Sequence, residues 1–508
     1  MPGRMEFQLT LPQSAPLLTR REAGAPLRIL IMADFSGRNH REASADLPDL
    51  DNRPLLPVDV DHFDTVMARF SPKVSLPLGV NGAALTISFG QLDDFHPDAL
   101  YQRLELFQAL RGSRARLLNP ASFDQAVAEL SPASPRSLSQ AQSGPTVAPE
   151  GEADLFERLL GQPPVATPLR RRLTDPGAAA IQSLLQMVVQ PHIERTDPRQ
   201  PAWVAAVDAA IGEQMRAILR QPAFQALEAT WRGAHSLIAH LDSDAVQVFL
   251  LDVTRSELLL DLRAADGHLQ ATSLYLRLID RGVHAHSGEP WSLLVGDYGF
   301  GAGAEDIALL AALGSLAAHA GGPFLAAAEP GALGCAAVAQ LADPAQWAAL
   351  PADAEQNWRR LRTSAVAPWI GLALPQILLR MPYGQKTDPI EAFAFEEMPA
   401  GRDPEAYLWG NPAFACARLI VDAFTENDRA FRPGDVLDIV DLPMHIYEEA
   451  GERVMQPATE ALLGERAMNA ILARGIMPLL GQRQRNAARL VRFQSLADPP
   501  VALAGAWR

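Results

Sequence analysis

A stretch rich in Ser, Pro, Gln and Gly, Ser131 to Gly151, divides this sequence and sets the strongest limit on how it can fold. Its isolated apolar residues cannot bury enough surface to offset the entropy of ordering, which is typical of a flexible linker. This stretch is the clearest boundary in the chain. The sequence therefore predicts one folded region at 1–130, a linker at 131–152 and a second folded region at 153–508.

Composition narrows the class of protein. With 48% hydrophobic and 20% charged residues over 508 positions, the chain has the content of a folded globular protein. Its net charge of −15 argues against a nucleic-acid partner, because a phosphate backbone requires a basic face. Two cysteines rule out a disulfide framework, and the start of the chain shows no signal segment, so we expect a cytoplasmic protein without membrane insertion.

The hydrophobic pattern predicts an α/β fold. The segment from Phe7 to Leu11 alternates, with Phe7, Leu9 and Leu11 on one face of a half-buried strand. Leu27–Ala33 is a buried strand, and strands at 73–78 and 84–89 flank a strong turn signal, Asn81-Gly82. Beyond the linker, strands alternate with helices, as in α/β proteins. The expected strands are 246–253, 291–295, 324–328 and 369–374. The expected helices include 255–262, 305–318 and a helical region at 203–241 that is interrupted at Pro222.

A glycine-rich run, Gly296 to Gly303, follows a buried strand and precedes a helix, which is the setting of a nucleotide-binding turn. The dinucleotide fingerprint fails in detail, because Ala304 stands where its third glycine belongs. We interpret the run as a strand-to-helix connection. The alternative is an α/β enzyme that uses this loop to bind a phosphorylated ligand.

Other candidate chemistry is weak. Neither lysine, Lys73 or Lys386, lies in a P-loop, and no nucleophile elbow occurs. His284 and His286 could share a face of a strand, but no further ligand motif accompanies them. Adjacent carboxylates such as Glu396 and Glu397 diverge on either a strand or a helix. The sequence therefore predicts no enzyme, no metal site and no cofactor.

Two stretches carry a resemblance to a known family. Pro26 to Arg38, then Val58 to Met67 and Phe89 to Asp98, resemble the small sheath subunit of type VI secretion systems, the TssB or VipA type. The order and spacing agree over roughly residues 5 to 130. Leu219 to Gly233, which ends in Trp231-Arg-Gly, resembles a signature of the large sheath subunit, the TssC or VipB type.

The second resemblance continues in order along the chain. Its later landmarks are Leu294–Tyr298, Asp306–Leu310, Pro323–Phe324, Trp358–Arg362, Leu379–Gly384, Tyr407–Asn411, Pro457–Glu460 and Gly475–Leu479. The resemblance implies two subunit-like halves of mixed sheets flanked by helices, joined by the flexible linker. Docking of the halves would be intramolecular, with a millimolar effective concentration if the linker spans the gap. The work would be mechanical, and Leu379–Gly384 and Tyr407–Asn411 would be aromatic anchors and turn residues.

The resemblance also implies partners. Besides other sheath subunits, these are the inner-tube protein and baseplate of the apparatus, and a ClpV-type AAA+ unfoldase that recognises the N-terminal helix of the large subunit. In this sequence that helix corresponds to 154–160, whose apolar side is formed by Leu155, Phe156, Leu159 and Leu160. Packing of this helix on its own domain is an equally good interpretation. The strand through Phe7, Leu9 and Leu11 would contribute to interlocking between protomers.

The resemblance departs from the family pattern after Asn486–Ser495, where typical large subunits continue further. We therefore expect a fused sheath protein lacking the usual C-terminal extension. A truncated or accessory protomer is favoured somewhat over a full polymerising subunit.

Overall fold

The computed structural model describes residues 25–40, 50–78, 83–119, 121–130, 200–241, 245–285, 288–427 and 431–507. The chain divides into two compact units, one formed by residues 1–100 and 215–508 and the other by residues 101–214. The linker lies outside the described residues. So do the helix at 154–160 and the strand at 7–11.

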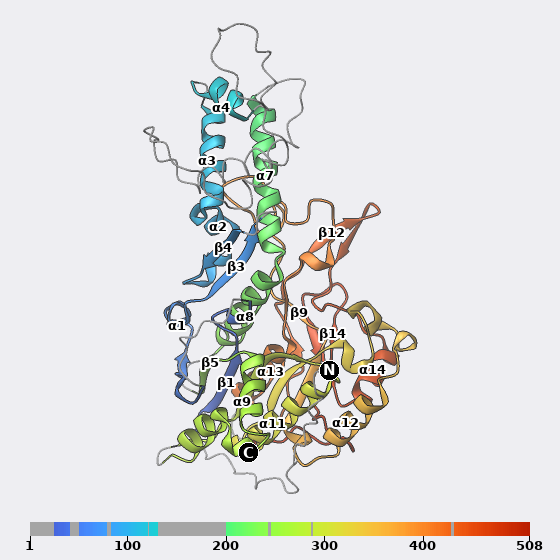
Figure 1. The fold of residues 1–508 in the computed structure, drawn as a ribbon. Coiled ribbons are helices and arrows are strands. Elements are labelled where there is room, and N and C mark those ends of the chain that lie inside the picture. Colours follow the sequence, from blue (N-terminus) through green and yellow to red (C-terminus); the bar gives the residue numbers. More distant parts are fainter. Residues whose placement is uncertain are drawn as a thin grey trace, which may run out of the picture. The chain divides into compact units, whose positions relative to one another are not determined.

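The larger unit is built on one mixed sheet, which has nine strands in the described part of the chain (Figure 1). The order is β11-β15-β14-β8-β7-β6-β1-β5-β2. The six strands from β14 to β5 are parallel to their neighbours, while β2, β15 and β11 pair antiparallel at the two edges. The bounds are β1 Leu27–Ala33, β2 Leu56–Val58, β5 Val246–Asp252, β6 Leu293–Phe300, β7 Phe324–Ala328, β8 Ile370–Leu374, β11 Asp438–Ile439, β14 Met477–Gly481 and β15 Ala488–Leu490.

The described residues also form three two-stranded sheets: β3 Lys73–Leu78 with β4 Ala83–Ser88, β9 Ile377–Leu378 with β10 Trp409–Gly410, and β12 Ile446–Glu449 with β13 Glu452–Met455. The helices of this unit include α1 Phe63–Phe70, α8 Pro222–Ile238, α9 Arg255–Ala264, α10 Ser273–Tyr275, α11 Ala304–Ala320, α12 Ala352–Arg362, α13 Pro412–Asn427, α14 Glu465–Ala473 and a π-helix at Leu276–Val283. The expected α/β class is confirmed.

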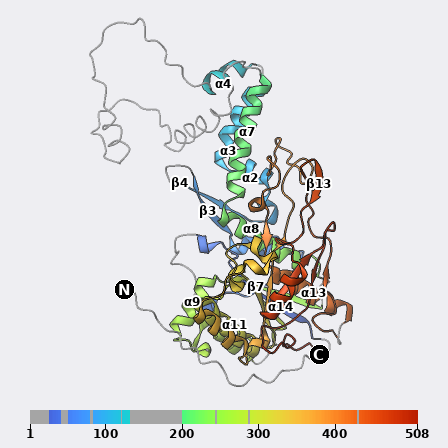
Figure 2. The same cartoon turned by 90° about the vertical axis from the view of Figure 1, so that its right-hand side faces the viewer.

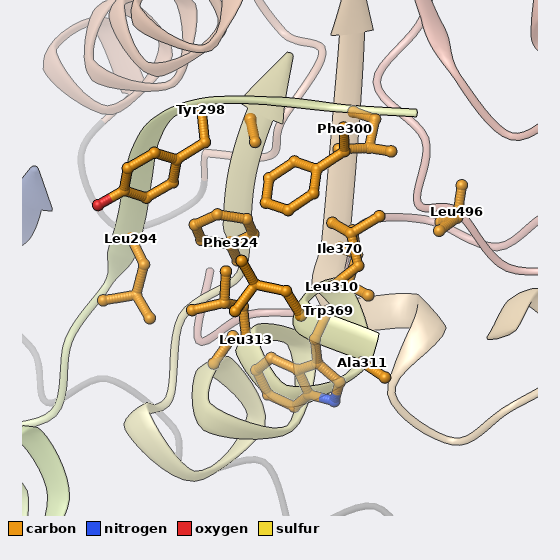
Figure 3. Packing of buried hydrophobic residues seen from close by; sticks show 14 of the residues in the cluster. Leu294, Tyr298, Phe300, Leu310, Ala311, Leu313, Phe324, Trp369, Ile370 and Leu496 are labelled. Atoms are coloured by element: carbon orange, nitrogen blue, oxygen red, sulfur yellow. The ribbon is translucent and has the colours of Figure 1, made fainter. Parts of the chain in front are cut away.

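The core of the sheet lies around β6, β7 and α11. All five residues of β7 are buried, as expected for a parallel strand that is covered on both faces. Both α11 and α13 contact β6, β7 and β8. On the α11 side, Leu294, Phe324, Leu310 and Leu313 belong to one apolar cluster (Figure 3). Because α11 is hydrophobic around nearly all of its circumference, it can only be a buried helix.

The described residues of the smaller unit are largely helical. It contains α3 Glu105–Leu118, α4 Phe123–Leu130 and most of α7 Gln200–Leu219, while α2 Pro97–Arg103 leads into it. Helices α3 and α7 run side by side in both views (Figures 1 and 2), and Arg114 Nε on α3 donates to Asp208 Oδ1 on α7 at 2.6 Å. Pro97 is the first residue of α2.

One expected boundary is wrong. The strand expected at 291–295 is β6, and it runs from Leu293 through Phe300, so most of the glycine-rich run is strand rather than loop. The glycines are there because neighbouring side chains come close. A Cβ on Gly296 would lie 2.5 Å from the ring of Phe324, and one on Gly299 would lie 2.9 Å from the carboxylate of Glu329.

Candidate functional site: the junction of the two sequence halves

The strand β1, which precedes the linker in sequence, lies in the middle of a sheet otherwise made almost entirely by residues that follow the linker. It pairs with β5 from Leu27↔Val246 to Ala33↔Asp252 and with β6 from Ile29↔Leu293 to Met32↔Gly296. Without β1, its two neighbours β5 and β6 would each present an unpaired edge. The two halves therefore complete one sheet and one core.

A cluster of charged side chains joins the halves beside the end of β1. Arg38 and Arg53 come from the first half, and both bind Glu257 of the second, at 2.9 Å and 2.6 Å for their Nη2 atoms. Arg38 also forms an ion pair with Asp252, the last residue of β5. Glu257 is held in place by the start of α9, where the backbone N–H of Thr254 donates to its carboxylate at 2.8 Å. These contacts fix the loop after β1 against α9.

The cluster controls the ionisation of its two acids. Burial alone would raise the pKa of Glu257. Hydrogen bonds from Arg53 and from the Thr254 backbone, together with the charge of Arg38, instead lower it to about 2. Burial raises the pKa of Asp252 despite the charge of Arg38. Glu257 is thus the carboxylate that the two arginines stabilise in its charged form.

Aromatic side chains form a second contact between the halves. Trp231 on α8 is fully buried among Phe35, Phe63 and Phe70, with ring centroids 5.0 to 5.9 Å apart. Its Nε1 donates to the carbonyl oxygen of Phe35 at 2.9 Å. The Trp-Arg-Gly landmark therefore begins with a tryptophan that anchors the first half of the chain.

The rest of that landmark is also structural. A Cβ on Gly233 would lie 2.6 Å from the ring of Phe414, so only glycine lets α8 approach α13 this closely. Arg232 binds the fully buried Glu228, which also accepts a hydrogen bond from Arg380 at 2.9 Å. Burial alone would raise the pKa of Glu228, but the charges of Arg380 and Arg232 hold it below its usual value.

Two later landmarks of the resemblance, Leu379–Gly384 and Tyr407–Asn411, also make structural contacts. Arg380 also binds Glu397, and the fully buried Tyr383 accepts a hydrogen bond from Arg232 at 3.1 Å. Further along, Tyr407 Oη lies 2.7 Å from His445 Nδ1, and Asn411 donates to the carbonyl of Tyr298. These contacts give Leu379–Gly384 and Tyr407–Asn411 structural roles in holding the core.

A cleft of about 590 Å³ opens where β1, β6, β7 and β8 end, the edge at which ligands bind in many open α/β sheets. Five carboxylates line it: Asp34, Asp297, Glu329, Glu405 and Glu460. Among its described lining residues only Arg255 is basic, and that side chain pairs with Asp306. The backbone N–H of Gly301 donates to the same Asp306 carboxylate. A phosphate group would meet negative charge here, so nothing in this cleft supports the phosphate-binding alternative.

The remaining sequence candidates do not come together. His284 is exposed, and His286 lies outside the described residues. In the described part of the chain, no cluster of three or more His, Cys, Asp or Glu side chains is arranged to hold a metal ion. Cys335 and Cys416 are buried free thiols whose pKa values are raised by burial. Over those same residues, no helix is long and apolar enough to cross a bilayer.

Sequence reasoning missed the four charged residues of the junction. The Thr254-x-x-Glu257 spacing is a capping-box signal that predicts the start of α9. It carries no information about Arg38 or Arg53, which lie some two hundred positions earlier. The candidate binding residues at 7–11 and 155–160 fall outside the described structure.

Comparison with known proteins gives two family matches. Residues 201–497 match the VipB family, described as "EvpB/VC_A0108, tail sheath N-terminal domain". Residues 19–130 match a family described as "Type VI secretion system, VipA, VC_A0107 or Hcp2".

Two curated proteins of Pseudomonas aeruginosa are similar to separate parts of the chain. The type VI secretion system sheath protein TssC1 is 32% identical over 305 residues, which are 58% of this chain and 61% of that protein. The sheath protein TssB1 is 28% identical over 103 residues, which are 19% of this chain and 58% of that protein. The chain thus spans about three fifths of the length of each relative.

Proposed function

The chain belongs to the VipB tail sheath family, and from this we propose that it is a structural component of a type VI secretion sheath in which small-subunit-like and large-subunit-like parts share one polypeptide. The observation that carries the proposal is the position of β1. A small-subunit strand completes the sheet of the large-subunit part, with pairing on both of its edges. A sheath protomer built from two chains would need the same joint, and here the joint is intramolecular.

We propose the boundaries 1–130 for the small-subunit-like part, 131–152 for the linker and 153–508 for the large-subunit-like part. We further propose that the protein is cytoplasmic and has no catalytic activity. Two features support a mechanical role: the buried anchors at the family landmarks and the acidic lining of the cleft where a phosphorylated ligand would have to bind.

Electron microscopy tests the proposed function directly. The purified protein is imaged alone and after mixing with separately encoded TssB-type and TssC-type subunits, with a tag on this chain. We expect the tag along or at the end of contractile sheaths. Long tubes formed by this chain alone would identify a full polymerising subunit, and decoration of one end would identify an accessory protomer. Absence of the tag from every sheath would contradict the proposal.

We propose the inner-tube protein, the baseplate and a ClpV-type unfoldase as further partners, the last through the apolar side of residues 154–160. The variant Leu155→Arg/Leu159→Arg should lose unfoldase binding, while Glu157→Arg on the same segment changes charge without removing an apolar contact. Equal binding by the two variants would contradict recognition of this helix. An inter-protomer role for Phe7, Leu9 and Leu11 predicts that their joint replacement by Ser reduces incorporation into sheaths.

A further inference from the structure

A small basic pocket lies at the edge of the sheet where β1 and β6 begin. It has a volume of about 210 Å³ and is lined by Arg28, Arg277 and Arg281, with Glu289 as its one acidic side chain among the described lining residues. In a chain of net charge −15, three guanidinium groups around one cavity give this site a charge opposite to that of most of the protein. This excess of positive charge favours an anionic group at the pocket.

Among the described residues, Arg28 and Arg281 of this pocket each have a carboxylate partner, whereas Arg277 has none. Arg28 forms an ion pair with Glu289, with Nε 3.4 Å from Oε2, and its guanidinium lies 4.5 Å from the ring centroid of Trp291. Burial lowers the pKa of Arg28 in spite of Glu289. Arg277 donates to a backbone carbonyl and forms no ion pair within the described chain, whereas Arg281 binds Asp51 at 2.9 Å.

The hairpin β12–β13 is an acidic projection. Both views show it standing away from the nine-stranded sheet (Figures 1 and 2). Glu449 and Glu452 face each other directly across its two strands, an arrangement of like charges that destabilises a hairpin. Glu448, opposite Arg453, is exposed as well. None of these three carboxylates forms an ion pair with another described residue, so a cation supplied from outside would relieve the repulsion.

The hairpin and the pocket lie at opposite ends of the parallel strands of the sheet. The base of the hairpin lies near the carboxyl-terminal ends of the strands, because His445 contacts Tyr407, which lines the acidic cleft there. The pocket contains Arg28, the second residue of β1, at the amino edge. The seven residues of β1 place its amino-terminal and carboxyl-terminal ends about 20 Å apart. The hairpin therefore cannot turn back into the pocket of its own chain, but it can reach the pocket of a second copy.

We propose that the Glu448–Glu452 tip of one copy binds in the Arg28–Arg277–Arg281 pocket of the next. This inference rests on the proposed function, since it names a partner surface within the sheath. The contact joins two different surfaces, so repetition gives an open-ended array rather than a closed dimer. Because the arginines are partly exposed, the contact weakens with salt: the Debye length falls from about 10 Å at 0.1 M to about 3 Å at 1 M.

Cysteine pairing tests the contact. The variants Glu449→Cys and Arg281→Cys are purified separately and then mixed under oxidising conditions, with the buried native cysteines left in place. We expect a disulfide-linked dimer in the mixture and none with either variant alone. Arg69→Cys, an exposed position on α1, serves as the matched control in place of Arg281→Cys. Equal cross-linking with the control, or none in the mixture, would overturn the proposal.

Charge exchange gives a second test that does not depend on oxidation. Glu449→Lys/Glu452→Lys and Arg277→Glu should each self-associate at least about tenfold more weakly than the parent chain in sedimentation velocity at low salt. An equimolar mixture of the two variants restores complementary pairs at every contact and should recover association. Failure of the mixture to recover association would count against the contact.

The two hypotheses fail in different ways. If the tagged chain enters sheaths but neither the cysteine mixture nor the charge-exchanged mixture responds, the pocket contact is wrong and the proposed function stands. If the cysteine mixture cross-links but the chain never enters a sheath, the contact stands and the proposed function is wrong.

Discussion

At the scale of single residues, Glu257 holds the two halves of the sequence together. Its carboxylate accepts hydrogen bonds from Arg38, from Arg53 and from the backbone at the start of α9. The side chain is 25% exposed, so it is bound by fixed donors and only partly solvated. A carboxylate that must be charged to bind two arginines makes the junction sensitive to acid.

We predict that Arg53→Met destabilises the fold by about 2 kcal/mol at neutral pH, because it removes charged hydrogen bonds to Glu257. The pKa of Glu257 is lowered from 4.5 to about 2 in the folded chain. The contribution of this carboxylate to the free energy of unfolding is therefore present above pH 4.5 and is lost as the pH falls toward 2. The difference in free energy of unfolding between parent and variant, from urea titrations, should therefore shrink over that range. Arg69→Met is the control, and a difference independent of pH would contradict the assignment.

At the scale of elements, β1 is distinguished by its neighbours rather than by its composition. Its seven residues are almost all buried, and each of its edges pairs with a strand from the other half of the sequence. Among the described strands, the edge strand β2 pairs only with β5. Backbone amides with partners on both sides and no exposure to solvent open only when the whole sheet unfolds.

We predict that the amides of 29–32 in β1 exchange with deuterium as slowly as those of 294–295 in β6. The amides of β2 and of the hairpin β12–β13 should exchange faster under the same conditions, and they serve as internal references. Hydrogen exchange followed by mass spectrometry measures all of these segments together. Fast exchange in β1 combined with slow exchange in β6 would mean that the first half detaches independently.

At the scale of the whole molecule, the compact unit that contains the complete sheet is larger than either half of the sequence. The compact unit that contains the sheet takes residues from both sides of the linker, and the helical unit does so too. Each half alone would expose apolar surface and open strand edges, which are prone to aggregation. The covalent link therefore supplies proximity, while the shared sheet supplies the binding energy.

We predict that residues 1–140 and 141–508, produced as two separate chains in one cell, purify as a one-to-one complex. Size-exclusion chromatography and mass measurement check the stoichiometry. Ile31→Pro in the shorter chain should abolish copurification, because proline in a central strand removes a ladder hydrogen bond and disrupts pairing. Recovery of the longer chain as a folded monomer without its partner would contradict the shared-sheet arrangement.

Much of the secondary structure could be predicted from local pattern. The expected strand Leu27–Ala33 has the same bounds as β1, and the hairpin flanking Asn81-Gly82 forms between β3 and β4. The end of β6 was missed because Gly296 and Gly299 look like turn residues in sequence. In the fold they are small because Phe324 and Glu329 occupy the space beside them.

The α/β class, most element positions and the likeness to two sheath subunits can be inferred from the sequence, since they depend on neighbouring residues and on motif order. The position of β1 between β5 and β6, and the binding of Glu257 by Arg38 and Arg53, become visible only in the folded chain. The difference lies in the distance along the sequence over which each kind of interaction acts. Periodicity reports which face of an element is apolar, but it does not say which distant strand will pair with it, because many buried strands offer the same hydrogen bonds. Here that choice is made by the packing of the whole unit around Trp231 and by the charges that close the junction.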